Sequence, residues 1–472
     1  MRNKHHVIIA GAGIAGLNAA RVLSAYGLDI LLLDDNMSPG GQYLRRVSKG
    51  LGVDFRPTGE RSKRNGYRLV HHIANTNVRI ESDTEILGIE GGRLVWALGK
   101  DGKIECHRCE HLILATGARE RFLPFPGWTL PGVISTGAAQ ILMKACGMLP
   151  GRKHLVGGAG PLPLLVAGEI AGSGGRVCAY WNQMPLLRQF SFLPGVWHHF
   201  AKLAQGMRQV TRLFLSGARL RHGCKILKAR GNGVLKEAVL AKIDGKGRVI
   251  QDSEKVYSVD CLAVGYGFVP NLELALLSGC DLTYDAAKGG WIVKVNNALQ
   301  SSVPSIVAAG EITGIAGAEK SAVEGKMAGL FVAYKMGSVS KSIYHQEMFR
   351  LQKKRRAELR FGGAVNAACR VPEDMLKDVP DSTLVCRCED ITMGEIRQRI
   401  ADGFTTLDAL KKATNAGMGN CQGRTCGPIL QDILQTVTPA ASAELRPFSI
   451  RSPIKPVLLS SLADCSHVES AD

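Results

Sequence analysis

Short apolar runs alternate with helical repeats in the first part of the chain. Val7–Ala10 is continuously apolar, and a glycine-rich turn separates it from a helical pattern over Leu17–Tyr26. Gly27 ends this helix, and a second apolar run follows at Ile30–Leu33. Because short apolar runs bounded by glycines are typical of buried strands, the pattern predicts a strand, a helix and a parallel strand.

A second unit of the same kind begins at His154–Val156. A glycine-rich turn follows it, with a helix near Pro161–Ile170 and another strand at Arg176–Tyr180. Much later, the apolar run Ile306–Ala309 indicates a strand that returns to the first unit. We therefore expect an α/β protein with two nested Rossmann-like dinucleotide-binding domains, the second inserted in the first.

The first turn has the spacing of a dinucleotide phosphate loop. Its glycines follow the pattern G-x-G-x-x-G, and Asp34 ends the next strand, with Asp35 as the neighbouring alternative. Glycines let the backbone approach a pyrophosphate, the helix N-terminus favours its charge, and the acid can accept a hydrogen bond from a ribose hydroxyl. The loop residues predicted to bind are Gly11, Ala12, Gly13, Ile14, Ala15 and Gly16.

The second turn departs from this pattern. Gly158 and Gly160 match, but Pro163 stands where the third glycine belongs, and Trp181 occupies the position of the ribose-binding acid. No arginine that could bind a 2′-phosphate flanks it. Nicotinamide dinucleotides therefore lose their main polar anchors here. We interpret the unit as a retained fold with a lost or changed ligand, and a nonstandard NAD site is the alternative.

Two cysteine pairs lie near the C-terminus, with the spacings C-x-C and C-x4-C. Four thiolates are the ligands that a 2Fe–2S cluster needs. Zinc is the alternative, but structural zinc sites favour C-x2–4-C pairs, and C-x-C is tighter than that. We therefore predict that a 2Fe–2S cluster is bound by Cys386, Cys388, Cys421 and Cys426.

Residues that typically begin and end helices lie between the two cysteine pairs. Thr392 and Glu395 have the spacing of a capping box that opens a helix, and Gly403 ends it. Thr405 or Thr406 can cap a second helix, which stops near Gly417. A pair of helices could therefore bring the cysteine pairs together.

Another motif, Cys106-x-x-Cys109, has redox spacing. It lies just before the predicted strand Leu112–Ala115, without the helix N-terminus that would lower a thiol pKa. We expect these two cysteines to be structural. The protein is then not a dithiol–disulfide reductase.

Composition narrows the class of protein. The chain has 472 residues, 13 cysteines and a net charge of +18, and it contains no apolar run of membrane-spanning length. The odd cysteine number in a large chain favours a reducing cytoplasm. The apolar start at Val7–Ile9 indicates a strand, so we expect no signal peptide there.

The basic run Lys353–Arg356 lies in a predicted helix from about Ser342 to Arg360, where it is typical of a solvated face. No nucleic-acid-binding motif accompanies the charge, so we expect no nucleic acid partner, and an acidic protein partner fits better.

Three further motifs, in chain order, resemble glutathione- and thioredoxin-reductase-like flavoproteins. The motifs are Gly-Gly-Gln, Ala-Thr-Gly-Ala and Ala-Gly-Glu. The resemblance implies that the first loop holds FAD, that the second motif closes on it, and that the final acid touches the ribityl chain. This acid is a glutamate where aspartate is commoner. By resemblance, the added FAD residues are Gly41, Gln42, Ala115, Thr116, Gly117, Gly310 and Glu311.

The whole chain resembles the FAD-containing α-type subunits of bacterial opine oxidases, hydrogen cyanide synthase, and D-hydroxyproline or proline dehydrogenases. The similarity lies in Leu123–Gly132, Gly265–Asn271 and Met418–Gly427, of which the last resembles the 2Fe–2S domain of bacterioferritin-associated ferredoxin. It implies an electron-relay subunit without catalytic residues of its own. A β-type FAD amine-oxidase subunit would be the partner, with a small additional subunit, an FMN between subunits and an acceptor in the respiratory chain. Association with the inner face of the membrane is left open.

The motifs divide the chain into five parts. These are a discontinuous FAD-binding domain, a degenerate second domain, a linker, an iron–sulfur domain and an extended tail. Three other functions stay open: an NAD(P)H-dependent flavin and iron–sulfur reductase, a subunit of a hydrogen cyanide synthase, and a non-catalytic scaffold. The predicted boundaries are 1–130 with 285–337, 131–284, 338–380, 381–435 and 436–472.

Overall fold

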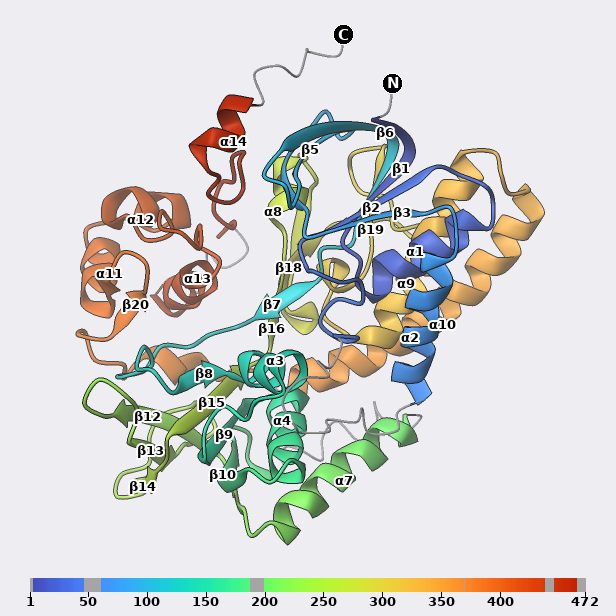
Figure 1. Ribbon diagram of the computed structural model, residues 1–472. Coiled ribbons are helices and arrows are strands. Elements are labelled where there is room, and N and C mark those ends of the chain that lie inside the picture. The colour runs from blue at the N-terminus through green and yellow to red at the C-terminus, as the bar shows by residue number, and fades with distance from the viewer. Residues whose placement is uncertain (1–2, 46–60, 187–198, 369, 438–444, 465–472) are drawn as a thin grey trace.

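The computed structural model describes residues 3–45, 61–186, 199–368, 370–437 and 445–464 (Figure 1). A mixed seven-stranded sheet, a parallel five-stranded sheet and a small helical unit make up most of the described molecule, with the second sheet below the first and the helical unit at one side of both (Figure 1). Among the described helices, none is long and apolar enough to cross a membrane.

The first sheet has seven strands around the predicted N-terminal unit. In β1 and β2 alternate side chains face opposite layers: Val7 and Ile9 face one apolar core, and Ile8 and Ala10 face another. Both faces are buried, which is why these strands are continuously apolar. The path is β3 (Arg79–Ser82), β2 (Ile30–Asp34), β1 (Lys4–Ala10), β6 (Ile104–Leu114), β5 (Leu94–Leu98) and β4 (Glu85–Glu90), and β19 (Ile306–Ala308) pairs with β6.

Helices cover one face of this sheet. The first core contains side chains of α1 (Ile14–Ser24) and α9 (Ala318–Lys335), and α2 (Arg61–Ala74) lies beside α1. The predicted linker, residues 338–380, was expected to contain a helix from about Ser342 to Arg360. It contains the 28-residue helix α10 (Lys341–Ala368), which packs on α9 of the first domain through Tyr344 and Met348.

The second sheet is parallel throughout, in the order β11, β10, β9, β15, β8. An antiparallel three-stranded sheet and three helices, α3, α4 and α7, accompany it. The bounds are β8 (Val133–Ser135), α3 (Thr136–Cys146), β9 (Lys153–Ala159), α4 (Pro161–Gly172), β10 (Arg176–Asn182), α7 (Phe200–Leu215), β11 (Arg219–His222), β12 (Cys224–Arg230), β13 (Glu237–Lys242), β14 (Lys255–Ser258) and β15 (Cys261–Tyr266).

The chain crosses between the two sheets in a pair of short antiparallel strands. It leaves the first sheet through β7 (Ala118–Glu120) and returns through β16 (Phe268–Pro270), between the two layers in Figure 1. These crossings lie before the predicted boundaries at residues 130 and 284. Helix α8 (Glu273–Leu277) and the hairpin of β17 (Leu282–Asp285) and β18 (Gly290–Val293) follow the return.

The C-terminal unit is small and helical. Thr392 and Glu395 form the predicted capping box, and Thr406 caps the second helix. The side chains of this unit share one apolar core with the second domain. Its elements are β20 (Leu384–Cys386), β21 (Ile391–Thr392), α11 (Met393–Ala401), α12 (Leu407–Thr414) and α13 (Cys426–Val437).

The described part of the tail returns to the first sheet. Its Ile454 N–H donates to the carbonyl of Leu87 in β4 over 3.0 Å, and Phe448 is buried in the core of the C-terminal unit. The tail was predicted to be extended. Its described part also contains a short helix, α14 (Leu459–Asp464).

We predict that Gly325→Ala destabilises the protein, because α9 crosses α1 at this glycine. A Cβ here would lie 2.1 Å from the carbonyl oxygen of Ala15, so the helices would have to separate, at a cost of about 1–3 kcal/mol. The control is Gly363→Ala in α10, where a Cβ meets nothing within 4 Å. Urea unfolding should show a loss for the first variant and a gain of up to about 1 kcal/mol for the control.

Candidate cofactor sites

The predicted phosphate loop has the geometry that a pyrophosphate requires. Gly11 has a φ of +108°, and a Cβ there would lie 2.5 Å from the carbonyl oxygen of Ala115. A Cβ on Gly16 would lie 1.9 Å from the carbonyl oxygen of Gly11. Gly13 caps α1, and nothing lies within 4 Å of its Cβ position. The loop thus leaves space before the N-terminus of a helix, where a phosphate is stabilised.

The two candidate acids at the end of β2 differ in environment. Asp34 is buried, accepts hydrogen bonds from the Ala12 and Asn36 backbone amides, and has a raised pKa because of burial. Asp35 is exposed and forms an ion pair with Lys455 of the tail at 3.3 Å. Asp34 therefore ties the phosphate loop to β2, and both acids line the adjacent cavity.

A cavity of about 2400 Å³ runs from the phosphate loop to the second domain, which is ample for a dinucleotide. Ala12 and Gly16 do not line it, because Ala12 is buried in the core and Gly16 packs against the carbonyl of Gly11. The other predicted flavin residues do line it, and they remain predicted contacts: Gly11, Gly13, Ile14, Ala15, Asp34, Asp35, Gly41, Gln42, Ala115, Thr116, Gly117, Gly310 and Glu311.

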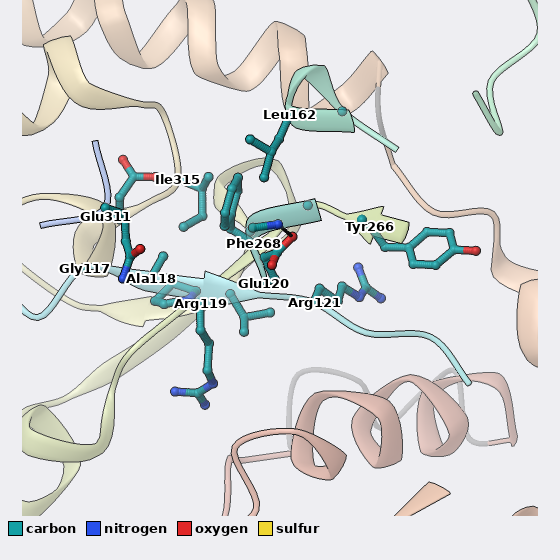
Figure 2. A pocket seen from close by; sticks show the side chains of 18 of the residues that line it. Gly117, Ala118, Arg119, Glu120, Arg121, Leu162, Tyr266, Phe268, Glu311 and Ile315 are labelled. Carbon is teal, nitrogen blue, oxygen red and sulfur yellow. Dashed lines mark hydrogen bonds between the residues drawn. The ribbon is translucent and has the colours of Figure 1, made fainter. Parts of the chain in front are cut away.

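Glu311 lies on this cavity at the N-terminus of α9 (Figure 2). Its Oε1 accepts from the backbone N–H of Gly317 over 2.9 Å and of Ala316 over 3.3 Å. Burial raises the pKa of this carboxyl. The late acid is thus held by the start of α9, beside the flavin motifs.

A buried charge cluster behind Glu311 was missed by the sequence analysis. Lys320 and Glu324 are both fully buried and pair at 2.7 Å, and Lys320 Nζ also donates to the carbonyl of Gly310 over 2.6 Å. Glu324 accepts from the N–H of Gly310 and from Arg355 Nε, over 2.9 and 2.7 Å. The i, i+4 spacing of Lys320 and Glu324 directly after the Ala-Gly-Glu motif was the available signal.

The members of the cluster shift one another's pKa. Burial lowers the pKa of Lys320, although Glu324 opposes this shift. Burial alone would raise the pKa of Glu324, but Lys320 and Arg355 hold it below its usual value. Arg355 belongs to the basic run that was predicted to be a solvated face, so that prediction was wrong for this residue: α10 packs on α9 and turns it inward.

The four predicted cluster ligands come together as two contacting pairs. Contact with Cys426 lowers the pKa of the Cys386 thiol to about 5, and backbone amides of the two loops also favour its thiolate. Cys388 and Cys421 form the second pair. Within the described residues, no three or more His, Cys, Asp or Glu side chains are grouped so that they could hold one metal ion together. Two thiol pairs fit a two-iron cluster, in which each iron takes two cysteines.

Glycines allow the cluster loop to pack closely. A Cβ on Gly419 would lie 2.3 Å from that of Cys388, so the loop could not approach this ligand with any other residue. The ring of Phe448 from the tail lies against Gly417, Gly423 and Gly427, within 2.7–3.1 Å of their Cβ positions. The tail therefore closes over the loop that carries Cys421 and Cys426.

The second nucleotide fold keeps its turn but has no ribose acid. Gly158 approaches Gly265 closely, and the space before α4 at Gly160 is open. Trp181 is fully buried and packs edge-on against Tyr266, at 6.2 Å between ring centroids. The side-chain carbonyl of Asn182 accepts from the N–H of Met184 over 2.9 Å. An apolar core residue thus stands where a dinucleotide ribose would need an acid.

Cys106 and Cys109 cannot act as a dithiol. Both lie inside β6, which begins at Ile104, earlier than predicted. Residues three apart in a strand point to opposite faces. Burial raises the pKa of the Cys109 thiol to about 12, so it stays protonated.

Comparison with known proteins agrees with this geometry. Residues 5–337 match the pyridine nucleotide-disulphide oxidoreductase model, and residues 384–436 match the BFD-like [2Fe-2S] binding domain. The chain belongs to the pyridine nucleotide-disulphide oxidoreductase family. The two matches imply FAD and a 2Fe–2S cluster as cofactors, so this family member is a flavin-dependent oxidoreductase with an iron–sulfur domain.

Relatives of this flavoprotein extend over nearly its full length. It is 31% identical to hydrogen cyanide synthase subunit HcnB of Pseudomonas aeruginosa, over 95% of this chain and 96% of the relative. It is 29% identical to an opine oxidase subunit of Rhizobium meliloti, over 100% and 89%. The structure of L-proline dehydrogenase from P. horikoshii shares the fold, with a TM-score of 0.70 at 22% identity, over 97% of this chain and 79% of that chain.

We predict that Lys320→Met strongly destabilises the protein. It removes one partner of a buried ion pair, which typically costs about 3–5 kcal/mol. Denaturant unfolding and the amount of flavin retained measure the effect. Arg350→Ala, which breaks the exposed pair with Glu347, is the control and should change neither. Equal stability of the Lys320 variant and the parent would contradict this account.

Each cluster ligand should be required for iron binding. Cys388→Ser and Cys421→Ser should lose the cluster absorbance and fall from about two irons per chain to nearly none, since serine is a poor ligand for iron–sulfur clusters. Flavin content should stay unchanged. Cys146→Ser replaces an exposed cysteine elsewhere and should keep the iron, as measured by metal analysis.

Proposed function

We propose that this flavoprotein is the electron-relay subunit of a heteromeric dehydrogenase acting on an amino acid, an opine or hydroxyproline. One observation carries the proposal. The cavity with the flavin motifs is joined directly to the cysteine loop, because Arg119, which lines that cavity, donates to the carbonyl of Arg424 in the cysteine loop over 3.1 Å. The second nucleotide fold, in contrast, lacks a ribose acid. Electrons that enter at the flavin then have an exit through the cluster.

Each part of the chain has a defined task in this relay. The glycine loop and the N-terminus of α1 would hold the pyrophosphate of FAD, and Asp34 orients that loop. Glu311, held by the start of α9, would contact the ribityl chain. FAD supplies the chemistry of accepting an electron pair and releasing single electrons. The four cysteines hold the cluster, and the exposed Cys388 marks the side from which an acceptor can approach.

The proposal assigns amine oxidation to a partner. The opine oxidase and hydrogen cyanide synthase relatives are named as subunits, which supports a heteromeric assembly. We infer a β-type FAD subunit that removes the hydride, with an FMN and a small further subunit at the interface, and an acceptor in the respiratory chain. We also infer a cytoplasmic location, from the cysteine usage alone.

An NAD(P)H-dependent reductase is the second candidate. The open space before α4 at Gly160 favours it, since a helix N-terminus with a glycine turn can bind a pyrophosphate. The buried Trp181 at the end of β10 opposes it, because neither ribose hydroxyl nor 2′-phosphate finds a charged partner there.

Anaerobic mixing separates the two candidates. We predict that neither NADH nor NADPH bleaches the flavin of the purified chain on the time scale of turnover. In the complex with its partner subunit, an N-substituted or cyclic amino acid should bleach the flavin and then reduce the cluster. Rapid bleaching by either nucleotide would contradict the relay proposal and favour the reductase.

A further inference from the structure

The turn that closes on the flavin is tied to a neighbouring loop. Thr116 Oγ1 donates to the carbonyl of Asn271, and Asn271 Nδ2 donates back to the carbonyl of Thr116, both over 2.8 Å. The N–H of Asn271 also donates to the carbonyl of Gly117 over 3.0 Å. Asn271 is therefore held in register with the Ala-Thr-Gly motif.

Arg119 extends this contact away from the flavin cavity. Its Nη1 donates to Asn271 Oδ1 over 2.9 Å and to Glu273 Oε1 over 2.6 Å. Its Nε donates to the carbonyl of Arg424 over 3.1 Å. Figure 2 shows the Arg119 side chain pointing away from Glu311, toward the helices drawn in pale red. One guanidinium thus bridges the flavin turn and the cysteine loop.

Arg424 completes the bridge on the cluster side. It lies between Cys421 and Cys426, and its own N–H and its Nη1 reach the carbonyl of Cys421 over 3.1 and 3.3 Å. Its Nη2 donates to the carbonyl of Ile454 in the tail over 3.0 Å. Glu273 Oε1 lies 4.0 Å from Arg424 Nε, so one carboxylate faces two guanidinium groups.

The iron–sulfur domain also makes contacts outside its cysteine loop. Its apolar core continues into the second domain, and Trp128 Nε1 donates to the carbonyl of Leu384 over 2.8 Å. Arg121 pairs with Asp432 in α13. These contacts position the domain as a whole. The contact of Arg119 with Arg424 holds the cysteine loop itself against the flavin turn.

We propose that Arg119, Glu273 and Arg424 are positioning residues that set the separation of FAD and the cluster, and thereby the rate of electron transfer between them. The inference rests on the proposed relay function. In each transfer the reduced flavin loses one electron and the oxidised cluster gains it, so no bond of the chain breaks. The side chains of Arg119, Glu273 and Arg424 are 25%, 13% and 20% exposed, so solvent screens this junction only in part.

Arg119→Lys tests the junction in the intact flavin- and iron-loaded chain. Lysine keeps the charge but donates from a single nitrogen, so it cannot replace the separate Nε and Nη1 donors of the guanidinium. A laser-generated reductant adds one electron to the flavin, and its passage to the cluster is followed by absorbance. We expect the transfer rate to fall about tenfold, as loss of a charge-assisted contact loosens the docked loop. The midpoint potentials of both cofactors should stay unchanged.

A matched control and a second readout separate positioning from general damage. Arg399→Lys lies in α11 of the same domain and alters an exposed pair with Asp402, so it should transfer electrons at the parent rate. In the cofactor-free chain, hydrogen exchange of amides 421–427 should quicken in the Arg119 variant and not in the control. Glu273→Gln is the second variant, and it should slow transfer about threefold, since a neutral acceptor weakens both guanidinium contacts.

The outcomes distinguish this inference from the relay proposal. Slow transfer at unchanged potentials in both junction variants supports the positioning role. Parent-like transfer in Arg119→Lys and in Glu273→Gln overturns the junction and leaves the relay standing. Failure of the unaltered chain to pass an electron from flavin to cluster overturns the relay itself. If the Arg119 variant does not fold, the Glu273 variant decides alone.

Discussion

The flavin side of the molecule depends on the contacts that the buried carboxylate of Glu324 makes. It accepts from the backbone of Gly310, from Lys320 in its own helix and from Arg355 in α10. A carboxylate at this depth without partners would be very costly, so its donors fix one another in place. The turn that carries Glu311, α9 and α10 are thereby locked together. Helix α9 then crosses α1 at Gly325, beside the phosphate loop.

The two nucleotide folds share a topology and differ at one decisive place. In the first, Asp34 ends β2, faces the cavity and braces the phosphate loop. In the second, β10 carries Trp181, whose ring joins the apolar core that continues into the iron–sulfur domain. The second fold thus packs against the iron–sulfur domain whether or not it binds a nucleotide.

The iron–sulfur domain is held by two kinds of contact with different consequences. Apolar side chains of the domain share one buried core with the second domain, and this burial is non-directional. Hydrogen bonds and ion pairs to the flavin turn and to the tail are weaker but directional, so they define where the cysteine loop lies. The tail contributes to both, since Phe448 packs on the loop glycines and Lys455 reaches Asp35 and Glu85.

The features that could be predicted from the chain alone rest on local backbone geometry. Glycines at Gly11 and Gly16 are forced by contacts that a Cβ would violate, and the capping box at Thr392 satisfies amides within one turn of helix. Spacing along the chain reveals such features because the residues that define each motif are only a few positions apart. Cys106 shows the limit: it was expected to lie just before a strand, and the strand in fact contains it.

Which distant side chains meet could be learned only from the folded molecule. Arg119 and Arg424 are 305 positions apart, and Arg355 reaches Glu324 only because α10 packs on α9. No local pattern specifies such a pair, since its geometry depends on how whole domains pack. The phosphate loop and the cysteine spacing could therefore be recognised in the chain. The contact between the flavin turn and the cysteine loop arises only in the fold.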